Sequence, residues 1–405
     1  MLSIFSQANV RPPHVKLVSN QKLKTWKFAA NYVWKEKFTE DKAELGRWTK
    51  GELLELGPTF VKLGQIASTR GDLYPPEFIR ELESLQDNVP AFDYNLVKDK
   101  LNMDIFKSFE ETPFRSASIG QVHRAVLKNG KHVVVKLKRP GIYKTMESDT
   151  NTVRKILKFF QTIGVDTGNS SDFVLNDSID YLLGEADYLQ EVENAIKFKK
   201  AMKGVDWVKI PRVYKRYCTD EMIVMEYVPT EKITEVKNKK INKKKVCEAL
   251  VNSYVIQTMD AGLFHADPHP GNLGVSKNGK LVFYDFGLLI DLSDELTEGF
   301  KDLFLCLINR DTKGIVNILI RLGVIVPTSS DVSDIELFFE NILGYLETLD
   351  GGAIMNDELA VELAMEKPFV VPTSFVYLAK SFSLIEGICL QLDPEFNYFT
   401  YLEPM

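Results

Sequence analysis

The pattern of hydrophobic and polar positions divides the chain into a helical start, a strand-rich middle and a helical end. Residues 41–69 carry large apolar side chains at helical spacing, and Pro75-Pro76 begins a second helix that continues to about Gln86, because proline suits a first turn. Residues 116–137 alternate between apolar and polar positions and predict strands. The Lys128-Asn129-Gly130 segment predicts a tight hairpin turn within them, since Asn-Gly tolerates positive φ.

The rest of the chain continues with mixed elements and then becomes mainly helical. The pattern predicts two helices, one buried strand, an apolar helix and a second hairpin, over residues 144–163, 173–201, 221–228, 246–264 and 274–284. Asn278-Gly279 supplies the turn of that second hairpin. A sheet-rich part followed by a helical part predicts an α+β chain with two lobes and a cleft between them.

Composition narrows the class of protein. The chain has 405 residues, of which 45% are hydrophobic and 26% charged, and this excludes a disordered or collagen-like chain. The net charge of -6 argues against a nucleic-acid partner. None of the four cysteines lies in a CxxC pair, so neither a zinc knuckle nor a disulfide framework is expected. No apolar stretch is long and uncharged enough to predict a transmembrane helix.

Two segments are strongly basic. The first 35 residues contain six lysines and arginines and no acidic residue. This segment is compatible with an organelle-targeting sequence, with a helix that touches a membrane, or with a solvated extension. Residues 237–245 are compatible with a solvated loop before a helix, which we favour, or with a patch for anionic lipid headgroups.

Polar residues around the second hairpin follow the order found in kinase-like phosphotransferases. The segment from His265 to Asn272 reads His-Ala-Asp-Pro-His-Pro-Gly-Asn, and the hairpin leads into Asp285-Phe286-Gly287. Asp267 would take or orient the proton of an acceptor hydroxyl or water. Asn272 and Asp285 offer the hard oxygen ligands that suit Mg²⁺ bound to nucleotide phosphates.

A phosphate-binding lysine is expected upstream. Lys136 lies on the return strand of the first hairpin, which is the context that a kinase lysine requires. Glu191 is the leading candidate for its carboxylate partner. The buried strand then predicts a hinge whose backbone would receive adenine, at Met225, Glu226, Tyr227 and Val228.

Three departures argue against a conventional protein kinase. No GxGxxG loop precedes Lys136; its place is taken by a loop of candidate nucleotide-binding residues, Ala117, Ser118, Ile119, Gly120, Gln121 and Val122. Position 266 is alanine, so the catalytic loop lacks the arginine that receives an activating phosphate. A helix starts near Ser293, which leaves no room for an activation segment that could dock a peptide.

Five stretches together resemble the UbiB family of atypical kinase-like proteins, also called aarF-domain-containing kinases. The stretch Gly57 to Gln65 resembles the family's KxGQ signature. The other four stretches cover residues 116–125, 133–141, 185–194 and 265–272. The resemblance covers about residues 45–395. It implies a protein-kinase-like, two-lobed α+β fold with a family-specific N-terminal helical extension over the cleft and a mainly helical C-lobe.

On this resemblance the chain is expected to divide into four parts. They are a basic extension over residues 1–44, a KxGQ helical extension over 45–110, an N-lobe with an inserted helix over 111–228, and a C-lobe over 229–405. Lys62 and Gln65 would lie in the active site, with Lys62 facing Glu185 and Asp187, and Lys136 would pair with Glu191.

The resemblance also implies a function. Family members bind ATP or ADP with Mg²⁺, behave as ATPases rather than protein kinases, and support ubiquinone or other prenylquinone metabolism at membranes. The implied partners are quinone or isoprenoid lipids, or proteins that make them, with peripheral membrane contact. The implied location is a mitochondrion or plastid in a eukaryote, and the cytoplasmic face of the inner membrane in a bacterium.

Two other functions fit the same catalytic residues. One is a soluble phosphotransferase of the aminoglycoside or choline kinase type, whose catalytic loop has the same order but which lacks the KxGQ helix. The other is a nucleotide-gated scaffold without turnover, against which the complete set of catalytic side chains argues.

Overall fold

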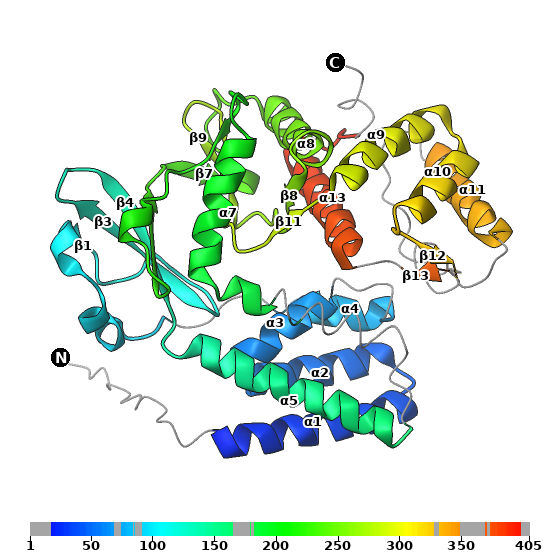
Figure 1. Cartoon of the computed structure of the whole chain (residues 1–405), viewed down its shortest axis with the longest axis horizontal. Helices are drawn as coiled ribbons and strands as arrows, with labels where there is room; N and C mark the ends of the chain where they lie inside the picture. Colours follow the sequence, from blue (N-terminus) through cyan, green and yellow to red (C-terminus); the bar gives the residue numbers. More distant parts are fainter. Residues whose placement is uncertain are drawn as a thin grey trace, which may run out of the picture.

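The computed structural model describes residues 18–68, 74–83, 85, 91–164, 179, 182–327, 332–348, 369–370 and 373–397. Part of the predicted basic extension, and the first residues of the helix predicted at 173–201, lie outside the described residues. Three groups of elements make up the fold: a helical extension, a small lobe built on a sheet, and a larger helical lobe (Figure 1).

The helical extension contains α1 (Val18–Phe38), α2 (Lys42–Leu56), α3 (Pro58–Ala67) and α4 (Pro76–Glu83). The single helix predicted over 41–69 was wrong. Gly57 has a φ of 100°, which interrupts the helix, and Pro58 begins α3. The helix predicted at 144–163 is α5 (Ile142–Thr162), and it packs beside α1 and α3 rather than remaining with the sheet of the small lobe (Figure 1).

The small lobe is an antiparallel sheet in the order β1-β3-β4-β6, with β2 added beside β3. Its strands are β1 (Phe106–Phe109), β2 (Arg115–Ser116), β3 (Gly120–Leu127), β4 (His132–Lys138) and β6 (Met222–Glu226). The predicted hairpin between β3 and β4 is confirmed, with Gly130 at a φ of 81°. Val133, Val135 and Leu137 of β4 point into a buried core. Because side chains alternate along a strand, Lys136 points to the opposite face, toward helix α7 (Tyr188–Ala201).

The large lobe is mainly helical, with small sheets on either side of the predicted catalytic residues. Its helices are α8 (Lys243–Met259), α9 (Asp294–Asn309), α10 (Thr312–Arg321), α11 (Ser333–Thr348) and α13 (Thr373–Leu392). One sheet has the order β5-β10-β9-β7, from β5 (Val208–Lys209), β7 (Thr230–Lys232), β9 (Leu273–Ser276) and β10 (Leu281–Phe283). Two short pairs join β8 (Leu263–His265) to β11 (Leu289–Asp291) and β12 (Val326–Pro327) to β13 (Phe369–Val370).

Short 3-10 helices link several of these elements. They cover Tyr94–Leu96, Lys98–Lys100, Met103–Ile105, Lys215–Tyr217 and Ile233–Glu235. The predicted hairpin at 274–284 is confirmed as β9 and β10, with Gly279 at a φ of 78°. The helix predicted at 246–264 ends at Met259, and His265 lies instead at the end of β8. None of the helices in the described ranges is long and apolar enough to cross a bilayer.

Candidate active site

A cleft of about 480 Å³ brings together residues from both lobes and from the helical extension. Fourteen of the predicted site residues line it: Lys62, Ala117, Ile119, Gly120, Val122, Lys136, Glu185, Met225, Glu226, Tyr227, Val228, Asp267, Asn272 and Asp285. Residues far apart in the sequence therefore share one cavity whose size suits a small ligand.

Lys136 lies at the centre of the cleft between two carboxylates. Its Nζ is 2.7 Å and 2.9 Å from the two carboxylate oxygens of Glu191, and 3.0 Å from Asp285 Oδ2. Burial opposes the charge on Lys136, but the carboxylates of Asp285 and Glu191 outweigh it and raise the pKa of Lys136 well above its usual value. Burial likewise opposes the charge on Asp285, but Lys136 holds the pKa of Asp285 well below its usual value. Both groups are therefore charged at neutral pH.

Only one of the two carboxylate oxygens of Asp267 has partners among the described residues. Asn272 Nδ2 donates to Asp267 Oδ2 at 3.0 Å and to the Asp267 carbonyl at 3.1 Å, and His269 Nε2 lies 3.6 Å from the same Oδ2. Within the described part of the chain, Asp267 Oδ1 accepts no hydrogen bond. Burial opposes ionisation of Asp267, but electrostatic interactions with His269, Lys380 and Lys62 lower its pKa. Oδ1 is thus an ionised acceptor available to a proton donor in the cleft.

His265 connects the catalytic loop to Asp285. Its Nε2 donates to the Asp285 carbonyl, and its Nδ1 accepts from the Asp267 amide at 3.3 Å. Tyr254 Oη donates to the His265 carbonyl at 2.7 Å. Burial lowers the pKa of His265, which favours the neutral tautomer that these two contacts require. His265 therefore fixes Asp267 and Asp285 relative to each other.

The helical extension adds a charge pair to the cleft. Lys62 Nζ on α3 lies 3.0 Å from Glu185 Oε2, one of the two carboxylates that the family resemblance placed opposite it. Gly64 allows α3 to pack closely, because a Cβ at this position would lie 2.5 Å from Leu85 Cδ1 and 2.7 Å from Leu53 Cδ1. The glycine of the KxGQ stretch is therefore explained by packing, and the lysine by its position in the cleft.

Five predicted site residues are not among the described residues that line the cleft. Glu191 is buried behind Lys136 and acts through it. Gln65 Nε2 donates to the Leu85 carbonyl at 2.8 Å, and Ser118 is fully buried in the loop before β3. The last two, Gln121 and Asp187, are corrections to the sequence-based assignment.

Gln121 and Asp187 have structural contacts instead of cleft contacts. Gln121 is buried on the face of β3 opposite Gly120 and Val122, where its Oε1 accepts from the Phe92 amide at 3.0 Å. Asp187 is exposed and caps α7, accepting from the amides of Leu189 and Gln190.

The sequence-based assignment missed two arginines that line the cleft. Arg115 Nη1 donates to the Gly271 carbonyl at 2.8 Å, so it joins β2 to the segment 265–272. Arg124 lies over the rings of Phe114 and Tyr227 at 5.0 Å and 5.5 Å. Arg124 could have been identified, because it is two positions from Val122 on the same face of β3.

The donor set suits Mg²⁺ held partly by phosphates. Asp285 offers a carboxylate and Asn272 an amide oxygen, both on the cleft wall. In the described ranges no three His, Cys, Asp or Glu side chains form a cluster that could hold a metal by themselves. Mg²⁺ commonly uses one or two carboxylates and completes its shell with phosphates and water. The residues present therefore fit this cation when a nucleotide supplies the remaining ligands.

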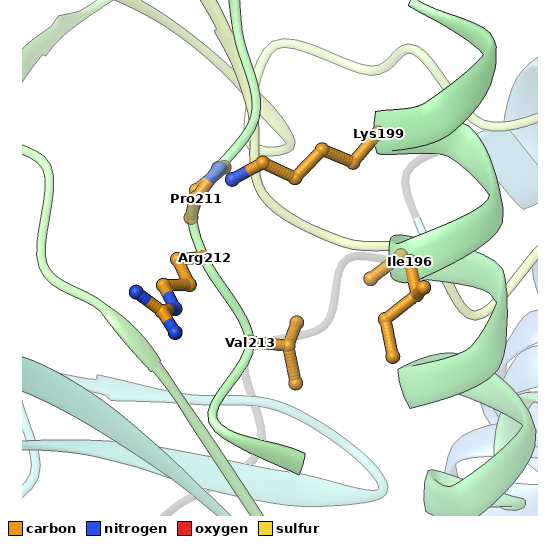
Figure 2. A pocket seen from close by; sticks show the side chains of 6 residues that line it. Ile196, Lys199, Pro211, Arg212 and Val213 are labelled. Carbon is orange, nitrogen blue, oxygen red and sulfur yellow. The ribbon is translucent and has the colours of Figure 1, made fainter. Parts of the chain in front are cut away.

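A second, smaller hollow lies outside the cleft. It has a volume of about 390 Å³ and is lined by Ile196 and Lys199 of α7 and by residues 211–213. Figure 2 shows the Ile196 and Val213 side chains facing each other, while Arg212 is directed away from α7. It contains none of the predicted site residues.

Comparisons with known proteins agree with this geometry. The sequence profile of the ABC1 atypical kinase-like domain matches residues 84–319. The uncharacterised protein sll1770 of Synechocystis is 35% identical over 94% of this chain and 67% of its own length. ACTIVITY OF BC1 COMPLEX KINASE 7, chloroplastic, of Arabidopsis thaliana is 35% identical over 94% of this chain. This chain spans only 56% of that plant relative.

A solved structure shares the fold. In the Rv3197–erythromycin complex from Mycobacterium tuberculosis, the chain superposes with a TM-score of 0.57 at 20% identity, over 82% of this chain and 88% of that one. The predicted α+β, kinase-like fold is confirmed. The profile match covers more than half of the sequence, and the relatives match nearly all of it. The chain therefore belongs to the ABC1, or UbiB, family of atypical kinase-like proteins.

Proposed function

We propose that this protein binds ATP or ADP with Mg²⁺ in the cleft, and that it hydrolyses ATP or transfers its terminal phosphoryl group to a small, lipid-related acceptor. The observation that carries this proposal is the pairing of Lys136 with both Glu191 and Asp285, beside an Asp267 carboxylate that keeps one oxygen free. The short segment between Gly287 and α9 supports a small acceptor over a peptide.

Each side chain would have a distinct task in this reaction. Lys136 would bind the phosphates while Glu191 holds its ammonium group in place. Asp285 and Asn272 would hold Mg²⁺, which when bound neutralises charge on the phosphates. Asp267 Oδ1 would take the proton of the attacking water or hydroxyl.

Nucleotide binding by the full chain tests the proposal. We expect ATP and ADP to raise the melting temperature in the presence of Mg²⁺ and much less in the presence of EDTA. Release of inorganic phosphate from ATP would then separate hydrolysis from transfer, because transfer requires an added acceptor. Absence of any Mg²⁺-dependent stabilisation at millimolar nucleotide would rule the proposal out.

We propose that the acceptor belongs to prenylquinone or isoprenoid lipid metabolism, in a plastid or a related photosynthetic membrane. This rests on the family and on relatives named as chloroplastic kinases. Comparing the prenyl lipids of cells with and without the protein tests it. Identical lipid profiles would contradict this role without affecting nucleotide binding.

Lys62 is predicted to keep protein substrates out of the cleft. It occupies the cleft through its pair with Glu185, so Lys62→Ala should open space beside Asp267 and increase autophosphorylation in the presence of ATP and Mg²⁺. Incorporation of labelled phosphate measures this. Lys144→Ala on the exposed side of α5 is the matched control. Equal incorporation in the two variants would contradict the role.

The exposed face of α1 is predicted to touch an anionic membrane. Leu23, Trp34 and Phe38 are each more than 60% exposed, and lysines flank them. Aromatic and basic side chains together suit a lipid interface. The double variant Trp34→Ala, Phe38→Ala should therefore sediment less with vesicles containing phosphatidylglycerol. Leu305→Ala, an exposed leucine on α9, should sediment like the wild type. Unchanged sedimentation of the double variant would rule out this face.

A further inference from the structure

The loop of candidate nucleotide-binding residues 117–122, here called the nucleotide loop, is hydrogen-bonded to one arginine. Arg139 follows β4, and its Nε donates to the Ser118 carbonyl at 3.0 Å, while its Nη2 donates to the Ala117 carbonyl at 3.3 Å. The Arg139 amide donates to the Ile119 carbonyl at 2.8 Å. Three successive carbonyls of the loop therefore accept hydrogen bonds from Arg139.

This contact fixes where the loop's amides point. In a trans peptide the N–H points opposite to the preceding carbonyl, so the amides of Ser118 and Ile119 point away from Arg139. Both residues are buried. In the described part of the chain, neither amide donates a hydrogen bond. Ser118 has no exposed surface and does not line the cleft, whereas Ile119 keeps some exposure and lines it. Buried amides almost always have a partner, so the Ile119 amide is the one that a ligand in the cleft would satisfy.

The ligand that fits is an anion in the cleft. Ala117, Ile119 and Gly120 line the same cleft as Lys136. Successive N–H groups that point into one concave site bind phosphate oxygens. A glycine-rich loop reaches this arrangement because it has no side chains to hinder it, whereas this loop retains them and needs an external constraint.

We propose that Arg139 is a positioning residue that orients the amide of Ile119 toward the phosphates of the nucleotide; this rests on the nucleotide binding proposed above. A guanidinium is suited to this task because its donors form a rigid planar fork. The Arg139 guanidinium also lies over the ring of Phe92, whose centroid is 5.4 Å from the guanidinium carbon. A lysine would supply the charge without the fork.

The packing on the other side of the loop keeps it in the same place. A Cβ on Gly120 would lie 2.3 Å from Tyr188 Oη and 2.6 Å from the Leu137 carbonyl. The loop is therefore packed against Tyr188 and β4 at Gly120 and bonded to Arg139 at Ala117 and Ser118. This leaves little freedom for the amides to turn.

Binding of ADP·Mg²⁺ and of adenosine to the full chain tests the inference by calorimetry. For Arg139→Met we expect ADP affinity to fall by about 10- to 100-fold, as for the loss of a hydrogen bond to a charged ligand, while adenosine affinity stays unchanged. Arg139→Lys should restore part of the ADP affinity. Arg216→Met is the matched control, since Arg216 is an exposed arginine that stacks on Tyr217 in the same lobe.

The outcomes separate this inference from the function on which it rests. If the wild-type protein does not bind ADP, the proposed function fails and the inference fails with it. If the wild type binds ADP and Arg139→Met binds it equally well, or loses ADP and adenosine affinity equally, only the inference is overturned. If Arg139→Met does not fold, Arg139→Lys carries the comparison. Hydrogen exchange of residues 117–120 should slow with ADP in the wild type and much less in Arg139→Lys.

Discussion

Replacing Asp285 with asparagine should abolish the Mg²⁺-dependent stabilisation by ATP and ADP. The substitution removes the ionised oxygens on the cleft wall that suit the cation, and it leaves the shape of the side chain unchanged. At a nucleotide concentration 100 times the wild-type Kd, the wild type gains about 2.7 kcal/mol, and the variant should gain close to none. Thermal unfolding with and without nucleotide measures the difference.

The fold should survive this substitution. Lys136 keeps two contacts with Glu191, and His265 bonds to the Asp285 backbone carbonyl rather than to its side chain. Asp291→Asn is the matched control, because Asp291 is an exposed aspartate six positions away whose partner is Lys197. A folded Asp285→Asn protein that responds to nucleotide as strongly as the control would remove Asp285 from the metal site.

The central site residues could be predicted because each has a distinctive local context. Lys136 follows three valines on a hairpin strand, and Asp267, Asn272 and Asp285 surround a second hairpin whose turn is evident in the sequence. Glu191 could be predicted only by its place in a helix of suitable charge. The structure brings it to 2.7 Å from Lys136.

Other features were missed for different reasons. The Gly57-Pro58 pair marks the helix break locally, but the apolar spacing over 41–69 continues across it and predicted one helix. Arg139 follows β4 as one of several basic residues, and nothing in its neighbours indicates that its guanidinium reaches back to the nucleotide loop. The family resemblance placed Asp187 opposite Lys62, but its place before α7 makes it a helix cap. Long side chains and helix ends are therefore where sequence-based assignment was weakest.

Replacing Asp267 with asparagine should stop turnover while leaving nucleotide binding intact. Asp267 is a cleft carboxylate with an oxygen free to take a proton, and its lowered pKa keeps that oxygen ionised. Loss of a general base commonly costs about 10²- to 10⁴-fold in rate, and we expect kcat for ATP to fall within that range while KM changes little. The asparagine carbonyl can still accept from Asn272 Nδ2, so the geometry of the catalytic loop should persist.

Comparing the two aspartate variants tests whether metal-dependent binding and proton transfer depend on different residues. Asp285→Asn should lose binding and turnover together, whereas Asp267→Asn should lose turnover alone, because only Asp285 is placed to share the cation with the phosphates. Asp260→Asn, at the exposed end of α8, controls for the removal of one nearby carboxylate. If Asp267→Asn hydrolysed ATP as fast as this control, the proton would have to go directly to water or phosphate. In that case the cleft would act through positioning and charge alone, and the free oxygen of Asp267 would need another explanation.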